Sequence, residues 1–199
     1  NKNMEFDLSE RKPDIRYLED IKAVVYDKEW AKTASSAELY YMFRGLEEKN
    51  GLRYDITLVP AKMLGQEFVK TKGHYHTGRY QELYMVLEGE AIFLAQKLDK
   101  SEKKIEDVFG VKVKAGQSVI IPSYYGHVTI NPSTTENLEM ANWVSIDCKS
   151  DYKQYEKKQG ACYYYLNSGW AKNENYKETP ELRFVEPLNS IPENLDFLK

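Results

Sequence analysis

The feature that most limits the fold is a series of short apolar runs between about residues 54 and 147, separated by turn-forming or charged residues. Short strands at even spacing favour an all-β sandwich or barrel. Asn50-Gly51 precedes the series between two Tyr-rich or branched runs, and Asn-Gly predicts a tight hairpin turn. The predicted strands are 53–60, 67–76, 82–89, 90–96, 109–116, 118–123, 127–133 and 138–146.

The flanking regions differ from this strand series. Residues 1–13 are expected to form an arm, and residues 14–35 to be partly helical. The charged stretch 97–109 is expected to form a hairpin excursion. A helix is predicted over 150–160, an aromatic strand over 161–167 and an extended tail over the last twenty residues. We expect one domain over residues 1–199, with a core at about 54–147.

Composition narrows the class of protein. Apolar residues make up 42% of the chain, which is enough for a substantial core, and the net charge is only −3. No basic stripe or arginine cluster appears in the sequence, so we expect no nucleic-acid partner. No apolar run approaches about 18 residues, so we expect no membrane span. The first residues, NKNMEFDLSERKPD, have no apolar signal core, and we expect a cytoplasmic protein with two free thiols, Cys148 and Cys162.

The histidines carry the first functional signal. The chain has three, and two of them form His74-Tyr75-His76. A lone histidine is usually a surface or core residue, but His-x-His in a strand places both rings on one face. Two neutral imidazoles side by side suit a borderline metal ion such as zinc or iron.

Two further residues strengthen this signal. Glu82 opens a predicted strand after a Gly-containing turn, so its carboxylate would face the rings, although such a residue alone is more often solvent-facing. His127 follows Pro122, which is expected to start a turn, and opens the return strand. All three histidines and one carboxylate can therefore converge.

These segments resemble the paired motifs of the cupin proteins. The first motif corresponds to His74, His76, Glu82 and Gly89, and the second to Gly116, Pro122, His127 and Asn131. The resemblance implies an all-β fold: a double-stranded β-helix (cupin) barrel, here with a partly helical N-terminal region and an extended C-terminal tail. It also implies one divalent metal ion (Fe, Zn, Mn or Ni). The implied ligands are His74, His76, Glu82 and His127.

Details around the motifs resemble the cupin-type glucose-6-phosphate isomerases, over about residues 38–160. These details are Thr71-Lys72-Gly73 before the first histidine, the five-residue gap before Glu82, and Gly126-His127-x-Thr129-x-Asn131. The resemblance implies interconversion of glucose 6-phosphate and fructose 6-phosphate, and a homodimer. It implies that a phosphorylated hexose is held through its phosphate by hydroxyls and main-chain groups rather than by an arginine cluster. The implied substrate-binding residues are Thr57, Thr71, Gly73 and Tyr152.

One further sugar-lining aromatic position of that family falls on Trp143, where a Tyr is expected and the spacing differs by one residue. Tyr84 shares strand parity with Glu82, so it either enters the site or fills the core. Without the resemblance, Thr71 would be read as a strand former and Gly73 as a bulge residue.

The chemistry leaves alternatives open. Aldose–ketose isomerisation moves hydrogen between adjacent carbons, and Glu82 is the candidate catalytic group for moving a proton. A hydride shift is the competing route. The four ligands also suit another metal-dependent cupin enzyme, such as a dioxygenase, and a non-catalytic sugar-binding cupin is the third possibility.

Overall fold

The computed structural model describes residues 4–199, so residues 1–3 of the expected arm lie outside it. Residues 4–13 form no regular element, and the arm prediction is confirmed for that part. The elements are β1 (Asp14–Tyr17), α1 (Leu18–Ile21), η1 (Lys22–Val24), α2 (Lys28–Thr33), β2 (Glu38–Lys49), β3 (Leu52–Val59), β4 (Met63–Leu64), β5 (Glu67–Phe68), β6 (Tyr75–His76), β7 (Glu82–Glu88), β8 (Glu90–Leu98), β9 (Ile105–Lys114), β10 (Ser118–Ile121), β11 (Gly126–Ile130), β12 (Leu138–Ser145), β13 (Ser150–Asp151), α3 (Lys153–Lys158), β14 (Tyr163–Leu166), β15 (Gly169–Lys172), β16 (Arg183–Phe184) and η2 (Asp196–Leu198).

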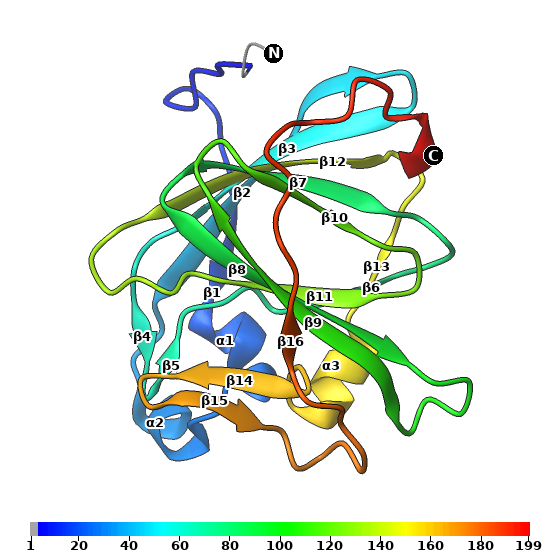
Figure 1. The fold of residues 1–199 in the computed structure, drawn as a ribbon. Helices are drawn as coiled ribbons and strands as arrows, with labels where there is room; N and C mark the ends of the chain where they lie inside the picture. Colours follow the sequence, from blue (N-terminus) through cyan, green and yellow to red (C-terminus); the bar gives the residue numbers. More distant parts are fainter. Residues whose placement is uncertain (1–3) are drawn as a thin grey trace.

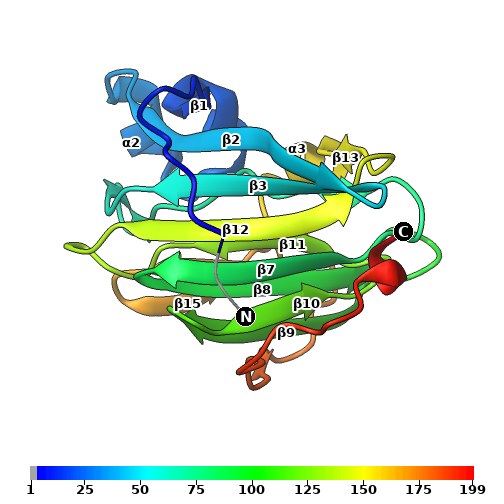
Figure 2. The same ribbon diagram turned by 90° about the horizontal axis from the view of Figure 1, so that it is seen from above.

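Two large sheets face each other and form a barrel (Figure 1). One sheet has the order β1-β2-β3-β12-β7-β10, and the other has the order β11-β8-β9-β16. Figure 2 shows β3, β12, β7 and β10 side by side in one layer, with β8 and β11 behind them. Strands distant in sequence, such as β3 and β12, are direct neighbours, as in a double-stranded β-helix. The predicted all-β cupin fold is confirmed.

The hairpin prediction is also confirmed, since β2 and β3 are antiparallel neighbours. Asn50 and Gly51 both have positive φ angles, 52° and 77°, as the two central residues of a type I′ turn require. A second irregularity lies within the same strand pair, where the register shifts between Phe43 and Glu47. Gly45 lies in this bulge with φ 66° and turns its N–H toward Asp55 Oδ1, 2.8 Å away.

The segment predicted as one long strand, 67–76, is different in the structure. Only β5 and β6 at its two ends are strands, so the prediction is wrong for residues 69–74. Gly73 has a φ of 86°, and a Cβ there would lie 2.7 Å from the buried ring of Tyr155. The chain therefore bends at a position that only glycine fits, and it resumes at His74, which bridges to His127.

The N-terminal region is partly helical, as predicted, and it begins with the additional strand β1. The Asp27 side chain accepts a hydrogen bond from Trp30 N at 3.0 Å and caps α2. Lys70 holds the preceding turn, because its Nζ donates to Val24 O at 2.6 Å. Lys70 thus ties this segment to the barrel, while β1 is held by pairing with β2.

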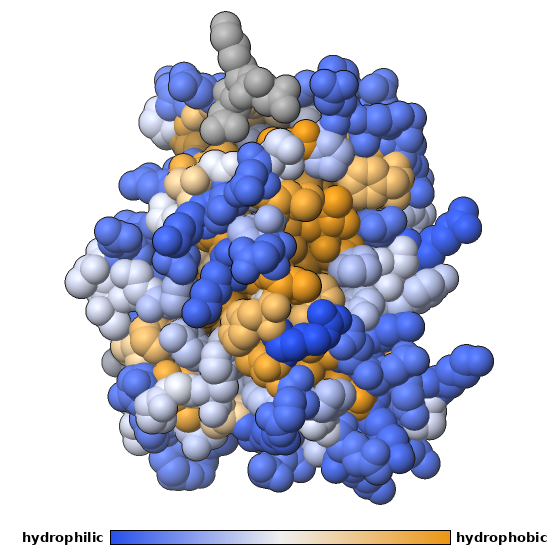
Figure 3. All heavy atoms as spheres, in the orientation of Figure 1, coloured by the Kyte–Doolittle hydropathy of each residue, from blue (hydrophilic) through white to orange (hydrophobic). Residues whose placement is uncertain are grey.

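The C-terminal region covers the outer side of the second sheet. The apolar run of β8 is buried on both faces, and Gln96 in it accepts a hydrogen bond from Cys162 N just before β14. Beyond β15 the tail is mostly extended, as predicted, and Leu188 pairs with Ser118. Apolar surface gathers where this tail crosses the face in Figure 3. Over residues 4–199, no helix has both the length and the apolar character needed to span a membrane.

Candidate active site

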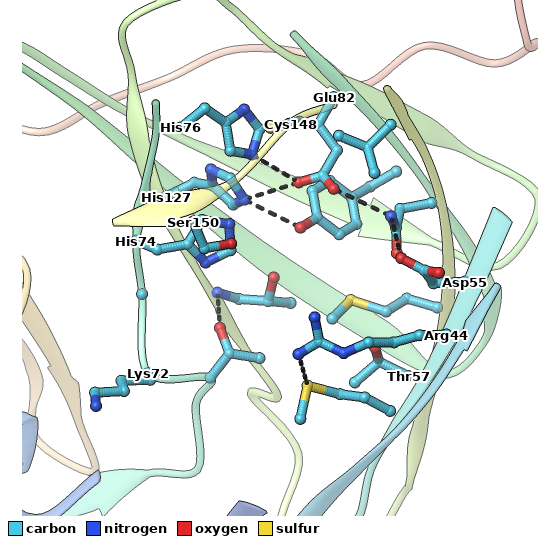
Figure 4. Close-up of a pocket in the computed structure, with 18 of the residues that line it drawn as sticks. Arg44, Asp55, Thr57, Lys72, His74, His76, Glu82, His127, Cys148 and Ser150 are labelled. Atoms are coloured by element: carbon cyan, nitrogen blue, oxygen red, sulfur yellow. Dashed lines mark hydrogen bonds and ion pairs between the residues drawn. The ribbon is translucent and has the colours of Figure 1, made fainter. Parts of the chain in front are cut away.

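Three histidines and one glutamate meet inside the barrel (Figure 4). His76 and Glu82 come from β6 and β7, while His127 comes from β11 and bridges to His74. One potential ligand atom from each of the four residues lies within 4.8 Å of the others. We call these residues the histidine–glutamate cluster. The structure thus brings together every residue that the sequence singled out as a metal ligand.

Hydrogen bonding orients His76 toward the cluster. Its Nδ1 lies 3.1 Å from Tyr80 O, and because a carbonyl only accepts, Nδ1 carries the proton. Its Nε2 faces Glu82 Oε1 at 3.4 Å. A backbone carbonyl that fixes one ring nitrogen in this way is typical of metal-binding histidines.

Burial and mutual contacts shift the pKa values of the cluster. Although burial alone would lower the pKa of His76, its contacts with Cys148 and Glu82 raise it to about 11. Burial opposes ionisation of Glu82, but the imidazoles of His127 and His76 beside it hold its pKa well below the usual range. Burial lowers the pKa of both His74 and His127. The cluster alone therefore contains one carboxylate, one imidazolium and two neutral imidazoles.

The cluster fits a divalent metal ion. Three imidazoles and a carboxylate form a nitrogen–oxygen donor set that suits Fe, Zn, Mn or Ni. Glu82 Oε1 is buried and makes no hydrogen bond within the described residues, although His127 Nε2 lies 3.1 Å away. A buried anionic oxygen without a hydrogen bond needs a cation beside it; His76 is that cation in the metal-free protein, and a divalent metal ion would take its place.

A second group of polar residues supports the carboxylate from behind. Asn142 donates from Nδ2 to Glu82 Oε2 at 3.0 Å and to Asp55 Oδ2 at 3.3 Å. Arg53 holds Asp55 through Nε and Nη2, at 2.9 and 3.0 Å. The sequence interpretation missed Asn142 and Asp55. Asn142 could have been found because it is a polar residue inside the mostly apolar predicted strand 138–146.

Tyr84 enters the site rather than only filling the core. Its hydroxyl lies 3.0 Å from His127 Nε2, and its side chain shares the inner face of β7 with Glu82. Burial raises the pKa of Tyr84 well above its usual value, so the hydroxyl stays protonated and can donate.

All four residues expected to bind substrate line the same pocket as the cluster. They are Thr57, Thr71, Gly73 and Tyr152. Thr71 Oγ1 accepts from Thr129 N at 3.0 Å, and the Tyr152 ring lies 5.5 Å from the His74 ring. Trp143 is not among the lining residues: it faces the outer side of β12 and packs 5.0 Å from the Tyr54 ring. Strand alternation turns its neighbours Asn142 and Val144 inward instead.

The pocket also gathers cations that are scattered in the sequence. No arginine cluster is visible in the sequence, yet the fold brings Arg16, Arg44 and Arg53 to one pocket, together with Lys72. Sequence spacing gave no signal for this, because the residues lie on three different strands and one loop.

Comparison with known proteins identifies the family. The sequence profile of the glucose-6-phosphate isomerase (GPI) family matches residues 13–181. The chain belongs to this family. The match extends beyond the range 38–160 over which the motifs suggested it, and it includes β1 and the C-terminal strands β14 and β15.

Similar curated proteins include glucose-6-phosphate isomerases from archaea. The chain is 32% identical to glucose-6-phosphate isomerase of Thermococcus litoralis over 126 residues, covering 60% of this chain and 63% of the relative. It is 30% identical to that of Pyrococcus abyssi over 123 residues, covering 59% and 62%. It is 28% identical to that of Thermococcus onnurineus over 149 residues, covering 72% of this chain and 75% of the relative. The matched region thus spans less than two thirds of the first two relatives.

Solved structures with a similar arrangement are more distant. Oxalate oxidase in complex with glycolate has a TM-score of 0.43 and 16% identity, covering 57% of this chain and 54% of that one. Vicilin from Corylus avellana has a TM-score of 0.41 and 13% identity, covering 57% and 31%. The fold assignment rests on the strand order described above.

Proposed function

We propose that this protein interconverts glucose 6-phosphate and fructose 6-phosphate. The observation that carries the proposal is the buried histidine–glutamate cluster, which opens on a pocket in a chain of the glucose-6-phosphate isomerase family. The family membership favours this reaction over that of a dioxygenase or a sugar-binding cupin, for which the four candidate ligands would serve equally well.

The cluster would hold one divalent metal ion, Fe, Zn, Mn or Ni, through His74, His76, Glu82 and His127. Such an ion would supply Lewis-acid chemistry by polarising the substrate carbonyl and neutralising developing negative charge. The side chains that surround the cluster keep bulk water away, because Glu82 and His127 are only 5% and 2% exposed.

Glu82 is the group that we assign to proton transfer between C1 and C2 of the open-chain sugar. Its Oε2 is fixed by Asn142, and its Oε1 faces the imidazoles of His76 and His127 inside the cluster. The low pKa of Glu82 keeps it ionised at neutral pH, as a base requires. The competing hydride shift needs no base, so solvent deuterium appearing in the product at C1 or C2 would favour Glu82 as the base.

For substrate binding, we assign Thr57, Thr71 and Gly73 to the phosphate end of the sugar and Tyr152 to its carbon chain. The two threonine hydroxyls and the glycine line one pocket, which supports this assignment. A Cβ at position 73 would collide with the buried ring of Tyr155, so glycine allows the main chain here to follow the path that lines the pocket.

The test is an assay of fructose 6-phosphate conversion, coupled to detection of glucose 6-phosphate, with protein stripped of metal and reloaded separately with Mn, Fe, Zn or Ni. We expect turnover with at least one ion and none after chelation. Absence of turnover with all four ions would overturn the proposal.

We propose a homodimer, supported by Phe184, Val185 and Leu188, apolar side chains of the tail that are 45%, 41% and 39% exposed. Light scattering on purified protein would measure its mass directly. We also propose one domain over residues 1–199, because Leu18, Phe93 and Tyr163 share one core cluster. The cytoplasmic location stays a prediction.

A further inference from the structure

The cations that line the pocket are not equivalent. Arg53 is occupied by Asp55, which it contacts through Nε and Nη2. Lys72 Nζ lies 2.6 Å from Glu156 Oε1, so its charge is also paired within the protein. These two side chains have their counter-charges in place and need no ligand.

Arg16 has no such partner. Within the part of the chain that the structure describes, from residue 4 onward, no carboxylate forms an ion pair with it. Its Nη2 donates to Tyr152 Oη at 3.2 Å, and the guanidinium lies 5.4 Å from the centre of that ring. Its Nε is buried without any hydrogen bond among residues 4–199. A partly buried guanidinium with a free N–H and no counter-charge costs free energy, which an anionic ligand would recover.

Arg44 is only loosely held. Its Nε lies 3.4 Å from Asp14 Oδ2, and that carboxylate is 72% exposed, so solvent weakens the pair. Its Nη2 contacts the thioether of Met42 at 3.2 Å, which is a weak acceptor. Figure 4 shows the Arg44 side chain extending into the pocket next to Thr57 and toward His74.

Strand register explains why both arginines reach the same pocket. Arg16 in β1 lies opposite Tyr40 in β2, and Met42 in β2 lies opposite Thr57 in β3. Tyr40, Met42 and Arg44 alternate on one face of β2, so Arg16 and Arg44 share the inner face of the sheet with Thr57. In Figure 4, Arg44 and Thr57 lie beyond the cluster, at the other end of the pocket.

From these contacts we infer that Arg16 and Arg44 bind the phosphate dianion of the substrate. The inference rests on the proposed function and adds two charged residues to the hydroxyl and main-chain groups assigned above. Two guanidinium groups supply two positive charges to a dianion, and their N–H donors match the oxygens of a phosphate. Binding would replace the weak contacts of Arg44 and would give the Arg16 guanidinium a counter-charge.

The experiment compares Arg16→Gln and Arg44→Gln with Arg11→Gln. Arg11 is exposed and lies outside the pocket, so this control removes the same charge elsewhere. Steady-state kinetics of metal-loaded protein with fructose 6-phosphate give KM and kcat. Calorimetric titration with inorganic phosphate gives an affinity that needs no turnover. Arg16→Lys and Arg44→Lys keep the charge and remove the guanidinium, and they replace the Gln variants if either fails to fold.

Each Gln variant should raise KM about tenfold or more, as the loss of a charged hydrogen bond predicts, while kcat changes much less. Phosphate affinity should fall in parallel, the Lys variants should be intermediate, and Arg11→Gln should match the parent protein. Normal turnover with unchanged KM and unchanged phosphate affinity in both Gln variants would overturn the inference alone. Arginine-dependent phosphate binding without any turnover of the parent protein would support the inference and overturn the proposed function.

Discussion

Two sites in this protein each contain a buried glutamate next to nitrogen-bearing side chains: the Glu67–Lys70 pair and the histidine–glutamate cluster. The Glu67–Lys70 pair lies between the N-terminal turn and the barrel, with side chains 1% and 4% exposed. The histidine–glutamate cluster is comparably buried at Glu82 and His127. Burial alone therefore does not distinguish them.

Their partners and their access to the pocket do distinguish them. Lys70 Nζ contacts Glu67 Oε2 at 2.6 Å, donates to Val24 O and lies 4.8 Å from the Tyr164 ring centre. Glu67 Oε1 accepts from Tyr26 N at 2.9 Å, and neither residue lines the pocket. The cluster, by contrast, lines the pocket, and among residues 4–199 Glu82 has only the imidazoles of His76 and His127 as ion-pair partners, with no lysine or arginine beside it. We infer that the pair stabilises the fold and that the cluster serves function.

The largest expected effect is on Glu82. Glu82→Gln should lower kcat/KM by about a thousandfold or more, because it removes both a metal ligand and the proposed base. The folded structure should persist, as circular dichroism can check. Glu88→Gln is the matched control, since Glu88 lies on the same strand but is exposed. Retention of activity within tenfold by metal-loaded Glu82→Gln would contradict the assigned role.

Substitution in the Glu67–Lys70 pair should lower stability and leave activity nearly unchanged. Lys70→Met leaves Glu67 buried without its counter-charge, and this should lower the free energy of unfolding by about 3–5 kcal/mol. The kcat/KM of the folded variant should stay near that of the parent protein. Urea denaturation measures the first quantity and the coupled assay the second.

Lys32→Met is the control for the buried pair. Lys32 Nζ and Glu29 Oε1 also lie 2.6 Å apart, but their side chains are 68% and 84% exposed. Lys32→Met should therefore lower the free energy of unfolding by less than about 1 kcal/mol. Equal losses in the two variants would mean that burial of the Glu67–Lys70 pair has no energetic consequence.

Asn142 is expected to act as a positioning residue behind the cluster. Asn142→Ala removes a hydrogen bond to the ionised form of Glu82, so the pKa of Glu82 should rise. The acid limb of the pH–kcat/KM profile should move to higher pH, with a loss of about 10- to 100-fold near neutrality. Asn167→Ala, at an exposed turn, should leave the profile unchanged. A lower rate with an unmoved acid limb would argue against positioning of Glu82.

The pH dependence of metal binding gives the smallest effect. With a pKa of about 11 in the metal-free protein, His76 is protonated at neutral pH, and a metal ion must displace that proton. Metal affinity should therefore rise about tenfold per pH unit between about pH 7 and 8.5. An ordinary histidine, with a pKa of about 6.5, would give little change in this range. Calorimetry with Mn²⁺ at several pH values distinguishes the two, and a flat profile would contradict the raised pKa.

The sequence predicted the strands well where side chains alternate or where a turn has a strong signal, as at Asn50-Gly51. It failed at residues 69–74, because the bend at Gly73 depends on the ring of Tyr155, which is distant in sequence. It also missed β1, which is stabilised by pairing with β2 rather than by its own pattern.

For the candidate site, the sequence predicted residues whose type and spacing are unusual. The three histidines and Glu82 converge as expected, because His-x-His and a strand-opening carboxylate are local signals. Arg16 and Arg44 could not be found in this way, since only strand register brings them to the pocket. Trp143 shows the reverse, because a one-residue difference turns its ring to the outer face of β12.

The central claim is that the histidine–glutamate cluster is a metal site and that the Glu67–Lys70 pair is not. The most direct measurement is an anomalous difference map from a zinc-loaded crystal, recorded on both sides of the zinc absorption edge. We predict one strong peak at about 2.0–2.2 Å from an imidazole nitrogen of each histidine in the cluster and from a carboxylate oxygen of Glu82. A map without a peak among these four side chains, from crystals shown to contain zinc, would contradict the account.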